Sequence, residues 1–206
     1  MDFSKLTAYL DSLQETYGIP MSDIRIMQSH EEIYRYRFGY ADFAKKVPLT
    51  EDHLFRLYSA TKLITMTASL QLIESGRLHF DDKLQQYLPE YAAVRVVDDA
   101  GLLYGSAVAA NASSHPAQKP ITIRQLMSMS AGFSYDTADE NIRKLVRDTN
   151  AQATTREIIA ALAKTPLLYE PGEHWHYSLA HDVMAAVVES VSGQTFGDYL
   201  KEHIFE

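Results

Sequence analysis

Residues 59–75 read SATKLITMTASLQLIES and are followed by Gly76. Apolar side chains recur through this stretch at helical spacing, and glycine is favoured just past the end of a helix. The stretch therefore predicts a well-packed helix over 59–75. Its first four residues form a Ser-x-x-Lys pattern, in which Ser59 and Lys62 lie one turn apart on the same face.

A hydroxyl and an amine placed side by side at the start of a helix can support nucleophilic catalysis. A serine hydroxyl is a poor nucleophile at neutral pH, and a lysine can take its proton only where burial or neighbouring cations hold the amine neutral. The backbone N–H of Ser59, at the helix start, can donate to a developing oxyanion. Because roughly one chance Ser-x-x-Lys is expected in a chain of this length, a capping serine and a solvated Lys62 are the alternative.

A second stretch, PGEHWHYSL at 171–179, predicts a turn that leads into a helix starting near Ser178. Tyr177 then lies at the junction of loop and helix, where its hydroxyl can project into a cleft. The alternative is a tyrosine packed under the turn.

The N-terminal part of the chain predicts one helix and one hairpin. Apolar residues at helical spacing run from Phe3 to Tyr17 and stop at Gly18. Residues 24–27 and 34–38 read as two strands joined by a polar turn. We expect no third clear strand.

After Gly76 the sequence predicts helices and loops. Capping boxes at Thr122/Gln125 and Thr154/Glu157 each predict the start of a short helix. Further helices are expected over 178–192 and from Thr195 onward, and residues 98–118 read as a surface excursion.

Composition excludes several classes of protein. The 206 residues are 46% hydrophobic and 22% charged, which is typical of a globular chain. A formal charge of -8 without a basic run argues against nucleic acid as a partner. The absence of cysteine excludes disulfides and thiolate metal sites, and charges interrupt the first 25 residues where a signal peptide would need an apolar run. With no long apolar stretch, we expect a soluble, cytoplasmic protein with no membrane segment and no cofactor.

Two other sets of side chains could suggest chemistry. His174, His176 and His181 are candidates for a metal site, although the Tyr177 stretch already accounts for their region. The adjacent carboxylate pairs 81–82 and 98–99 do not face each other on a helix, so we interpret them as surface or capping groups. We expect no metal.

Six blocks match one family in order and spacing: 54–62 LFRLYSATK, 72–78 LIESGRL, 87–90 YLPE, 121–132 ITIRQLMSMSAG, 171–179 PGEHWHYSL and 188–193 VESVSG. On these blocks the chain from Glu51 to Glu206 resembles the serine β-lactamases and penicillin-binding proteins. The resemblance is strongest to the class C-like branch of esterases and D-alanyl-D-alanine carboxypeptidases. It implies an α+β, β-lactamase/transpeptidase-like fold with a helical lobe beside part of an antiparallel sheet.

The resemblance also implies roles for three residues. Ser59 would be the nucleophile, Lys62 would assist its deprotonation, and Tyr177, the first residue of the family's Tyr-x-Asn element, would pass the proton to the leaving group. A phenol, with a pKa of about 10, acts as a base near neutrality only where cations stabilise its phenolate. We therefore assign the base to the pair of Lys62 and Tyr177 and leave open which of the two accepts the proton.

Two departures from the family pattern shape the expected function. Leu179 stands where the family often has asparagine, and it cannot hydrogen-bond the amide that many β-lactams and peptides carry. The family's Lys-Thr-Gly element is absent from the sequence. We therefore expect residues 1–206 to be one domain that lacks its C-terminal strands, with an opening helix and hairpin over 1–48 and the nucleophile helix and helical lobe over 49–206.

These features together predict a serine hydrolase that forms an acyl-enzyme on Ser59. Its substrate would be a small acyl compound, with ester or peptidase-like hydrolysis as the reaction and Leu179 as part of the binding wall. The alternatives are a β-lactamase or D-Ala-D-Ala carboxypeptidase, and a non-catalytic binding protein of the same fold. We expect little turnover from the 206 residues alone, and self-association through an unpaired sheet edge.

Overall fold

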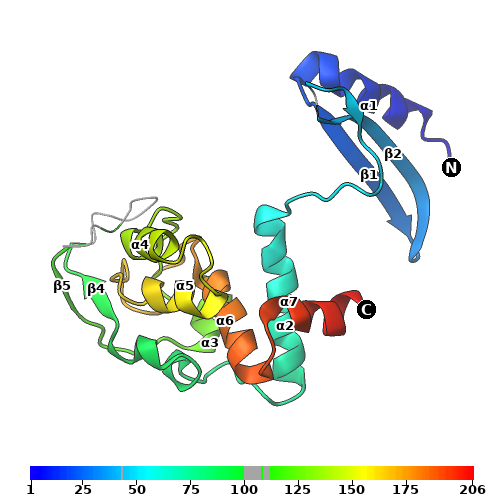
Figure 1. The fold of residues 1–206 in the computed structure, drawn as a ribbon. Helices are drawn as coiled ribbons and strands as arrows, with labels where there is room; N and C mark the ends of the chain where they lie inside the picture. Colours follow the sequence, from blue (N-terminus) through cyan, green and yellow to red (C-terminus); the bar gives the residue numbers. More distant parts are fainter. Residues whose placement is uncertain (43, 100–107, 109–111) are drawn as a thin grey trace. The chain divides into compact units, whose positions relative to one another are not determined.

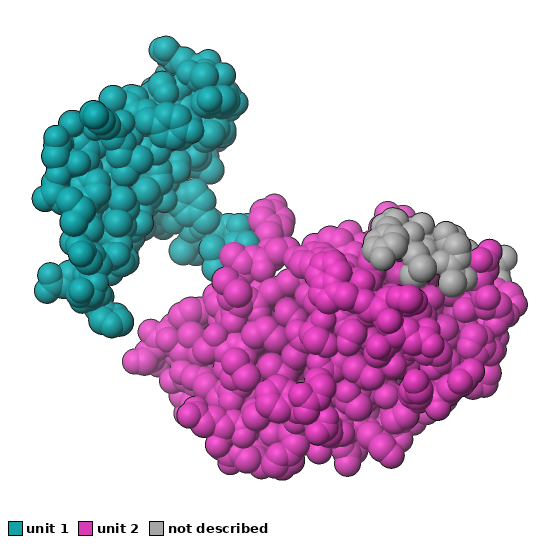
Figure 2. Space-filling model, turned by 180° about the vertical axis from the view of Figure 1, so that it is seen from behind, with its two compact units in different colours: residues 1–57 teal, residues 58–206 magenta. Residues whose placement is uncertain are grey.

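The computed structural model describes residues 1–42, 44–99, 108 and 112–206. They form two compact units, Met1–Leu57 and Tyr58–Glu206, coloured teal and magenta in Figure 2. The division falls between Leu57 and Tyr58, whereas we expected the boundary between 48 and 49. That both units belong to a single domain stays a prediction.

The first unit is a helix with a small antiparallel sheet. Its elements are α1 (Ser4–Tyr17), β1 (Met21–Gln28), β2 (Glu31–Asp42) and β3 (Val47–Pro48). The strand order is β1-β2-β3, so the predicted helix and hairpin are confirmed. The expectation of no third strand is wrong, because β3 has only two residues and is too short to show an alternating pattern.

The two faces of the β1–β2 hairpin differ because side chains alternate along a strand. One face carries a row of aromatic rings, Tyr34, Tyr36 and Phe38, and the ring of Phe3 lies 4.7 Å from that of Tyr34. Phe3 immediately precedes α1, so this contact brings the helix onto the aromatic face.

The other face of the hairpin carries a charged cluster. Asp23 accepts hydrogen bonds from Arg35 Nη2 at 2.9 Å and Arg37 Nε at 3.0 Å. These bonds, chiefly the one from Arg35, lower the pKa of Asp23 to about 2.

The second unit is mainly helical. Its α-helices are α2 (Thr61–Glu74), α3 (Ile123–Met127), α4 (Glu140–Asp148), α5 (Thr155–Leu162), α6 (Ala180–Ser192) and α7 (Phe196–Leu200). Turns of 3₁₀-helix lie at Tyr58–Ala60, Leu84–Gln86 and Pro89–Ala93, and one turn of π-helix lies at Lys201–Phe205. Both predicted capping boxes are confirmed at the starts of α3 and α5.

A two-stranded antiparallel sheet also lies in the second unit, formed by β4 (Arg95–Val97) and β5 (Ser114–Pro116). The residues beyond Gly76 are mostly helices and loops, as predicted, and these two strands were not predicted because strands of three residues are too short to show an alternating pattern. β5 lies inside the expected surface excursion over 98–118, of which residues 100–107 and 109–111 lie outside the described part.

The core of the second unit surrounds α6. Figure 1 shows this helix among α2, α3 and α5, and its residues Val183, Met184 and Val187 are fully buried. Ala68 and Leu72 of α2 are buried in the same cluster. Helices with small antiparallel sheets confirm the predicted α+β class, and no helix in the described ranges is long and apolar enough to cross a membrane.

Candidate active site

Ser59 and Lys62 lie at the start of α2, as the sequence predicted. Ser59 belongs to the 3₁₀ turn at Tyr58–Ala60, which runs directly into the helix, and Lys62 is the second helical residue. Tyr58, just before the serine, has a φ of 47°, in the left-handed region that side chains other than glycine rarely adopt. The backbone therefore turns sharply where it presents Ser59.

Both residues line one cavity of about 290 Å³, which we call the Ser59 cavity. Its walls are formed by Tyr58, Ser59, Thr61, Lys62, Tyr135, Thr137, Leu179 and Asp182. The structure thus brings three of the predicted site residues, Ser59, Lys62 and Leu179, to a common space. Its size is at the lower end of pockets that hold small molecules.

The fourth predicted residue, Tyr177, contacts Lys62, which lines the Ser59 cavity. The Lys62 Nζ lies 5.2 Å from the centroid of the Tyr177 ring and 5.5 Å from that of Tyr135. The two rings meet edge to face, with centroids 5.0 Å apart. Since both distances are within the range of cation–π contacts, the amine of Lys62 lies against two aromatic faces.

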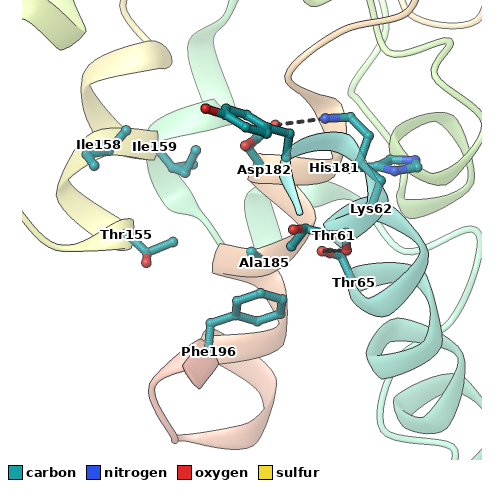
Figure 3. Close-up of a pocket in the computed structure, with 11 residues that line it drawn as sticks. Thr61, Lys62, Thr65, Thr155, Ile158, Ile159, His181, Asp182, Ala185 and Phe196 are labelled. Carbon is teal, nitrogen blue, oxygen red and sulfur yellow. Dashed lines mark hydrogen bonds and ion pairs between the residues drawn. The ribbon is translucent and has the colours of Figure 1, made fainter. Parts of the chain in front are cut away.

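A carboxylate completes the surroundings of Lys62. Asp182 Oδ2 lies 3.8 Å from Lys62 Nζ, and this ion pair is the dashed contact in Figure 3. The Lys62 side chain is only 16% exposed, whereas that of Asp182 is 52% exposed. Partial desolvation raises the pKa of the Asp182 carboxyl, and Lys62 acts in the opposite direction.

Backbone hydrogen bonds between two loops bring Tyr135 beside Tyr177. The N–H groups of four residues in the second loop donate to carbonyls in the first, in the pairs Leu168–Gly132, Gly172–Ser130, His176–Met129 and Leu179–Ser134, over 2.7–3.1 Å. The first loop leads into Tyr135 and the second contains Tyr177. The relative position of the two rings therefore follows from backbone pairing.

Leu179 occupies the N-cap position of α6 and offers no side-chain cap. Its side chain is 8% exposed and belongs to the main hydrophobic cluster, while also lining the Ser59 cavity. The helix begins at Ala180, two residues after the predicted start, and Tyr177 lies half-buried at the junction of loop and helix, as expected.

A second cavity of about 310 Å³ lies among the helices and has Lys62 in its lining (Figure 3). Its lining includes Thr65 from α2, Ile158 and Ile159 from α5, and Ala185 from α6. It shares Tyr58, Thr61, Lys62 and Asp182 with the Ser59 cavity. Lys62 and Asp182 therefore line both cavities.

The three histidines considered for a metal site lie in different surroundings. The His174 ring is 5.2 Å from that of Tyr169, His176 is buried, and His181 Nε2 donates to the carbonyl of Met127 at 3.1 Å. Burial lowers the pKa of both His176 and His181. Within the described ranges, no three histidine or acidic side chains are grouped to hold a metal ion.

The acidic pairs have structural contacts. Asp82 accepts hydrogen bonds from the His79 N–H and the Tyr87 hydroxyl, and Asp81 pairs with Arg124 at 2.9 Å. Asp98 accepts a hydrogen bond from Ser113 and lies 2.8 Å from His115 Nδ1. These contacts agree with the capping and surface roles predicted for the two pairs.

Two residues around Lys62, Tyr135 and Asp182, were not predicted from the sequence. The sequence carried a weak indication of Asp182, because an acidic residue in the first turn of the helix after Tyr177 lies at the same helix end as that tyrosine. Tyr135 carried none, since it follows a loop whose pairing with residues 168–179 depends on backbone atoms alone.

Comparison with known proteins identifies the family. A model of the β-lactamase family matches residues 6–206. A lovastatin esterase of Penicillium rubens is 33% identical over 167 residues, covering 79% of this chain and 39% of the relative. Esterase EstB of Burkholderia gladioli is 34% identical over 182 residues, covering 83% of this chain and 41% of the relative. The chain thus spans about two fifths of the length of these relatives.

The solved structures give the same result. EstCE1, described as a hydrolase with promiscuous acyltransferase activity, superimposes with a TM-score of 0.78 at 26% identity. The match covers 98% of this chain and 50% of EstCE1. From the extent of the family match and the shared fold, the chain belongs to the β-lactamase family of serine enzymes.

Proposed function

We propose that this chain carries the nucleophile side of a serine hydrolase that forms an acyl-enzyme on Ser59. The observation that carries the proposal is the Ser59 cavity, which combines a hydroxyl at a helix start with the amine of Lys62. The relatives named as esterases support hydrolysis of an ester.

The reaction needs a group that takes the serine proton. In the first step Ser59 Oγ bonds to the acyl carbon, and the ester alcohol leaves with the electrons of the broken C–O bond. The proton released by Ser59 passes through the pair of Lys62 and Tyr177 to that alcohol. In the second step water attacks the acyl carbon, the acid leaves, and the serine regains a proton by the same route.

The transition state also needs donors for the negative oxygen. We assign one of them to the backbone N–H of Ser59, which lies in the turn that leads into α2. Removing a single such donor typically slows an enzyme by about 100- to 1000-fold, so activity depends on the complete set. The relatives are more than twice as long as the matched region, and further donors can come from that additional length.

The substrate class follows from Leu179. Its buried side chain gives the Ser59 cavity an apolar wall where an asparagine would offer an amide. An ester of a small, weakly polar acyl group suits such a wall better than the amide-bearing side chain of a β-lactam. β-Lactam hydrolysis and carboxypeptidase activity therefore rank below esterase activity.

Labelling of the full-length protein with a fluorophosphonate probe tests the proposal. We expect the probe to modify Ser59, as located by peptide mass spectrometry, and Ser59→Ala to abolish the adduct. Ser128→Ala removes another exposed serine and serves as the matched control, with labelling unchanged. Tyr177→Phe should slow the labelling by about 100-fold, since general acid–base groups contribute about 10²–10⁴.

The rival function is a binding protein of the same fold without catalysis. It predicts no fluorophosphonate adduct at Ser59 and no penicillin adduct. An unlabelled Ser59 in the full-length protein, folded by circular dichroism, would refute the hydrolase proposal. A cytoplasmic location and self-association through a sheet edge stay predictions.

A further inference from the structure

His115 lies between two carboxylates that belong to different segments of the chain. It is the middle residue of β5, and its Nδ1 lies 2.8 Å from Oδ1 of Asp98, which directly follows β4. Its Nε2 lies 3.4 Å from Oε1 of Glu170, in the segment that leads into the loop of Tyr177. Each ring nitrogen therefore faces one carboxylate, and the ring connects the β4–β5 sheet with that segment.

Glu170 is the more firmly held of the two carboxylates. Its side chain is 10% exposed, and its two oxygens accept the N–H of Gln118 at 3.0 and 3.1 Å. The same segment also bonds to β4 through the backbone, because the Leu167 N–H donates to the Arg95 carbonyl at 2.7 Å. Glu170 therefore has a fixed position at which the imidazole of His115 can bond to it.

The number of N–H groups on the imidazole decides whether both contacts can form. A protonated imidazole carries an N–H on each nitrogen and donates to both carboxylates at once, whereas a neutral imidazole carries only one N–H. The second nitrogen of the neutral ring presents a lone pair to a carboxylate oxygen, and these two groups repel each other. The connection between sheet and segment is thus complete only when His115 is charged.

We propose that His115 forms a pH-dependent clasp with Asp98 and Glu170, which joins the segment of Glu170 to the β4–β5 sheet when the imidazole is protonated and releases it as the pH rises. The same segment continues to Tyr177, so the clasp holds the start of the loop that carries this tyrosine. None of the three clasp residues lines the Ser59 cavity, and the proposal does not depend on acyl transfer.

The charges around the ring set the pH range of the clasp. The hydrogen bond to Asp98 is the main reason why the pKa of His115 lies above its ordinary value of 6.5, and Glu170 acts in the same direction. Arg95 of β4 also belongs to these surroundings, since its guanidinium donates to Ser114 and attracts the Asp98 carboxylate. A raised pKa means that the contribution of the charged form is complete below pH 6.5 and is lost as the pH rises through the raised value. We therefore expect the clasp to be closed at pH 6 and open at pH 9.

Hydrogen exchange of the full-length protein measures the clasp without requiring activity. The amides of Gln118 and Leu167 are compared between the unaltered protein and His115→Gln at the same pH, so that the intrinsic exchange rate cancels. Glutamine has a single donating nitrogen and no charge, and it therefore resembles the neutral imidazole at every pH. We expect both amides to exchange about fivefold faster in the variant at pH 6, and equally fast in the two proteins at pH 9.

His79→Gln is the matched control variant. The side chain of His79 is exposed in the same compact unit, and within the described ranges it makes no hydrogen bond or ion pair. This substitution should leave the exchange of both amides unchanged. The amides of α6 lie in the core and serve as the internal reference, because their exchange should be equal in all the variants.

Glu170→Gln separates the clasp from a contact within the β4–β5 sheet. If His115 acts through Glu170, the combined variant should exchange its Leu167 amide no faster at pH 6 than Glu170→Gln alone. A further fivefold acceleration in the combined variant, about the full effect of His115→Gln, would mean that His115 acts through Asp98 alone, and it would overturn the clasp.

Two other results would overturn the proposal. One is equal exchange of the unaltered protein and His115→Gln at pH 6, and the other is an acceleration of the same size at pH 6 and pH 9, which would indicate a role in packing independent of charge. Labelling of Ser59 plays no part in these measurements, so failure of the clasp and failure of the proposed acyl transfer are told apart.

Discussion

Leu179→Asn probes a side chain that belongs to both the core and the Ser59 cavity. Leucine and asparagine branch at the same carbon and have similar shapes, so the substitution replaces apolar by polar surface without creating a large void. The Leu179 side chain is 8% exposed, and its backbone N–H already bonds to Ser134. The change therefore tests the chemistry of the side chain rather than the loop's backbone pairing.

The expected loss in the free energy of unfolding has two parts. Fully burying a leucine side chain contributes about 1.5–3 kcal/mol, nearly all of which is lost here. Placing an amide in a mostly apolar site costs a further ~1–3 kcal/mol, reduced where the amide can face the cavity. We expect the free energy of unfolding to fall by about 3 kcal/mol, which for a chain of this size lowers Tm by about 6–12 °C.

Thermal unfolding followed by circular dichroism measures the stability, with Leu179→Met as the control because a volume-conserving apolar change should cost less than about 1.5 kcal/mol. Adduct formation measures the function. The new amide should raise the yield of the penicillin adduct relative to the fluorophosphonate adduct. A Tm within 2 °C of the unaltered chain would refute the burial of Leu179, and an unchanged adduct ratio would refute its role as the apolar wall.

Three further changes test other parts of the structure. The hydrogen bond to Asp98 raises the pKa of His115 above 6.5. The charged His115 therefore contributes its full stabilisation of the fold below pH 6.5, and this contribution is lost as the pH rises through the raised pKa. His115→Gln should lower Tm at pH 6 but hardly at pH 9. Arg35 lowers the pKa of Asp23 from its ordinary 3.8 to about 2, so the ionised carboxylate stabilises the hairpin unit at pH 7. Asp23→Asn should destabilise this unit at pH 7, as measured by hydrogen exchange or circular dichroism. The difference in stability between the variant and the unaltered chain should disappear as the pH falls through 2. A Cβ at Gly132 would lie 2.5 Å from the Tyr169 carbonyl oxygen, whereas a Cβ at Gly76 would have no atom within 4 Å. In urea unfolding, Gly132→Ala should lower the free energy of unfolding by about 3 kcal/mol and Gly76→Ala by about 1 kcal/mol. Equal losses would contradict the steric explanation.

Local patterns in the sequence were sufficient for the parts of the fold and site that depend on neighbouring residues. Helical periodicity predicted α1 and α2, and two capping boxes predicted the starts of α3 and α5. The shared position of Ser59 and Lys62 also follows from local geometry, since residues three apart on a helix lie on the same face. Tyr177 was placed at its junction by the Pro-Gly turn before it.

Interactions between distant segments left no such pattern. β4 and β5 have three residues each, and they pair with each other across residues 98–113 of the chain. Tyr135 joins Tyr177 because backbone groups of two loops bond to each other, and backbone groups are the same for every residue type. The contact of Asp182 with Lys62 can be predicted only once α2 and α6 are known to pack together.

The aromatic pair around Lys62 depends on the backbone of the 129–135 loop more than on either ring. Gly132 has a φ of 96°, its carbonyl accepts the Leu168 N–H at 2.7 Å, and its lack of a side chain allows the Tyr169 carbonyl to approach. A side chain at this position must push the two loops apart, and Tyr135 lies only three residues further along the first of them. Since Tyr135 and Tyr177 face Lys62 from the two loops, a change at Gly132 should alter the surroundings of the amine without touching it. We therefore expect the buried Gly132 to influence how the two rings lie against Lys62.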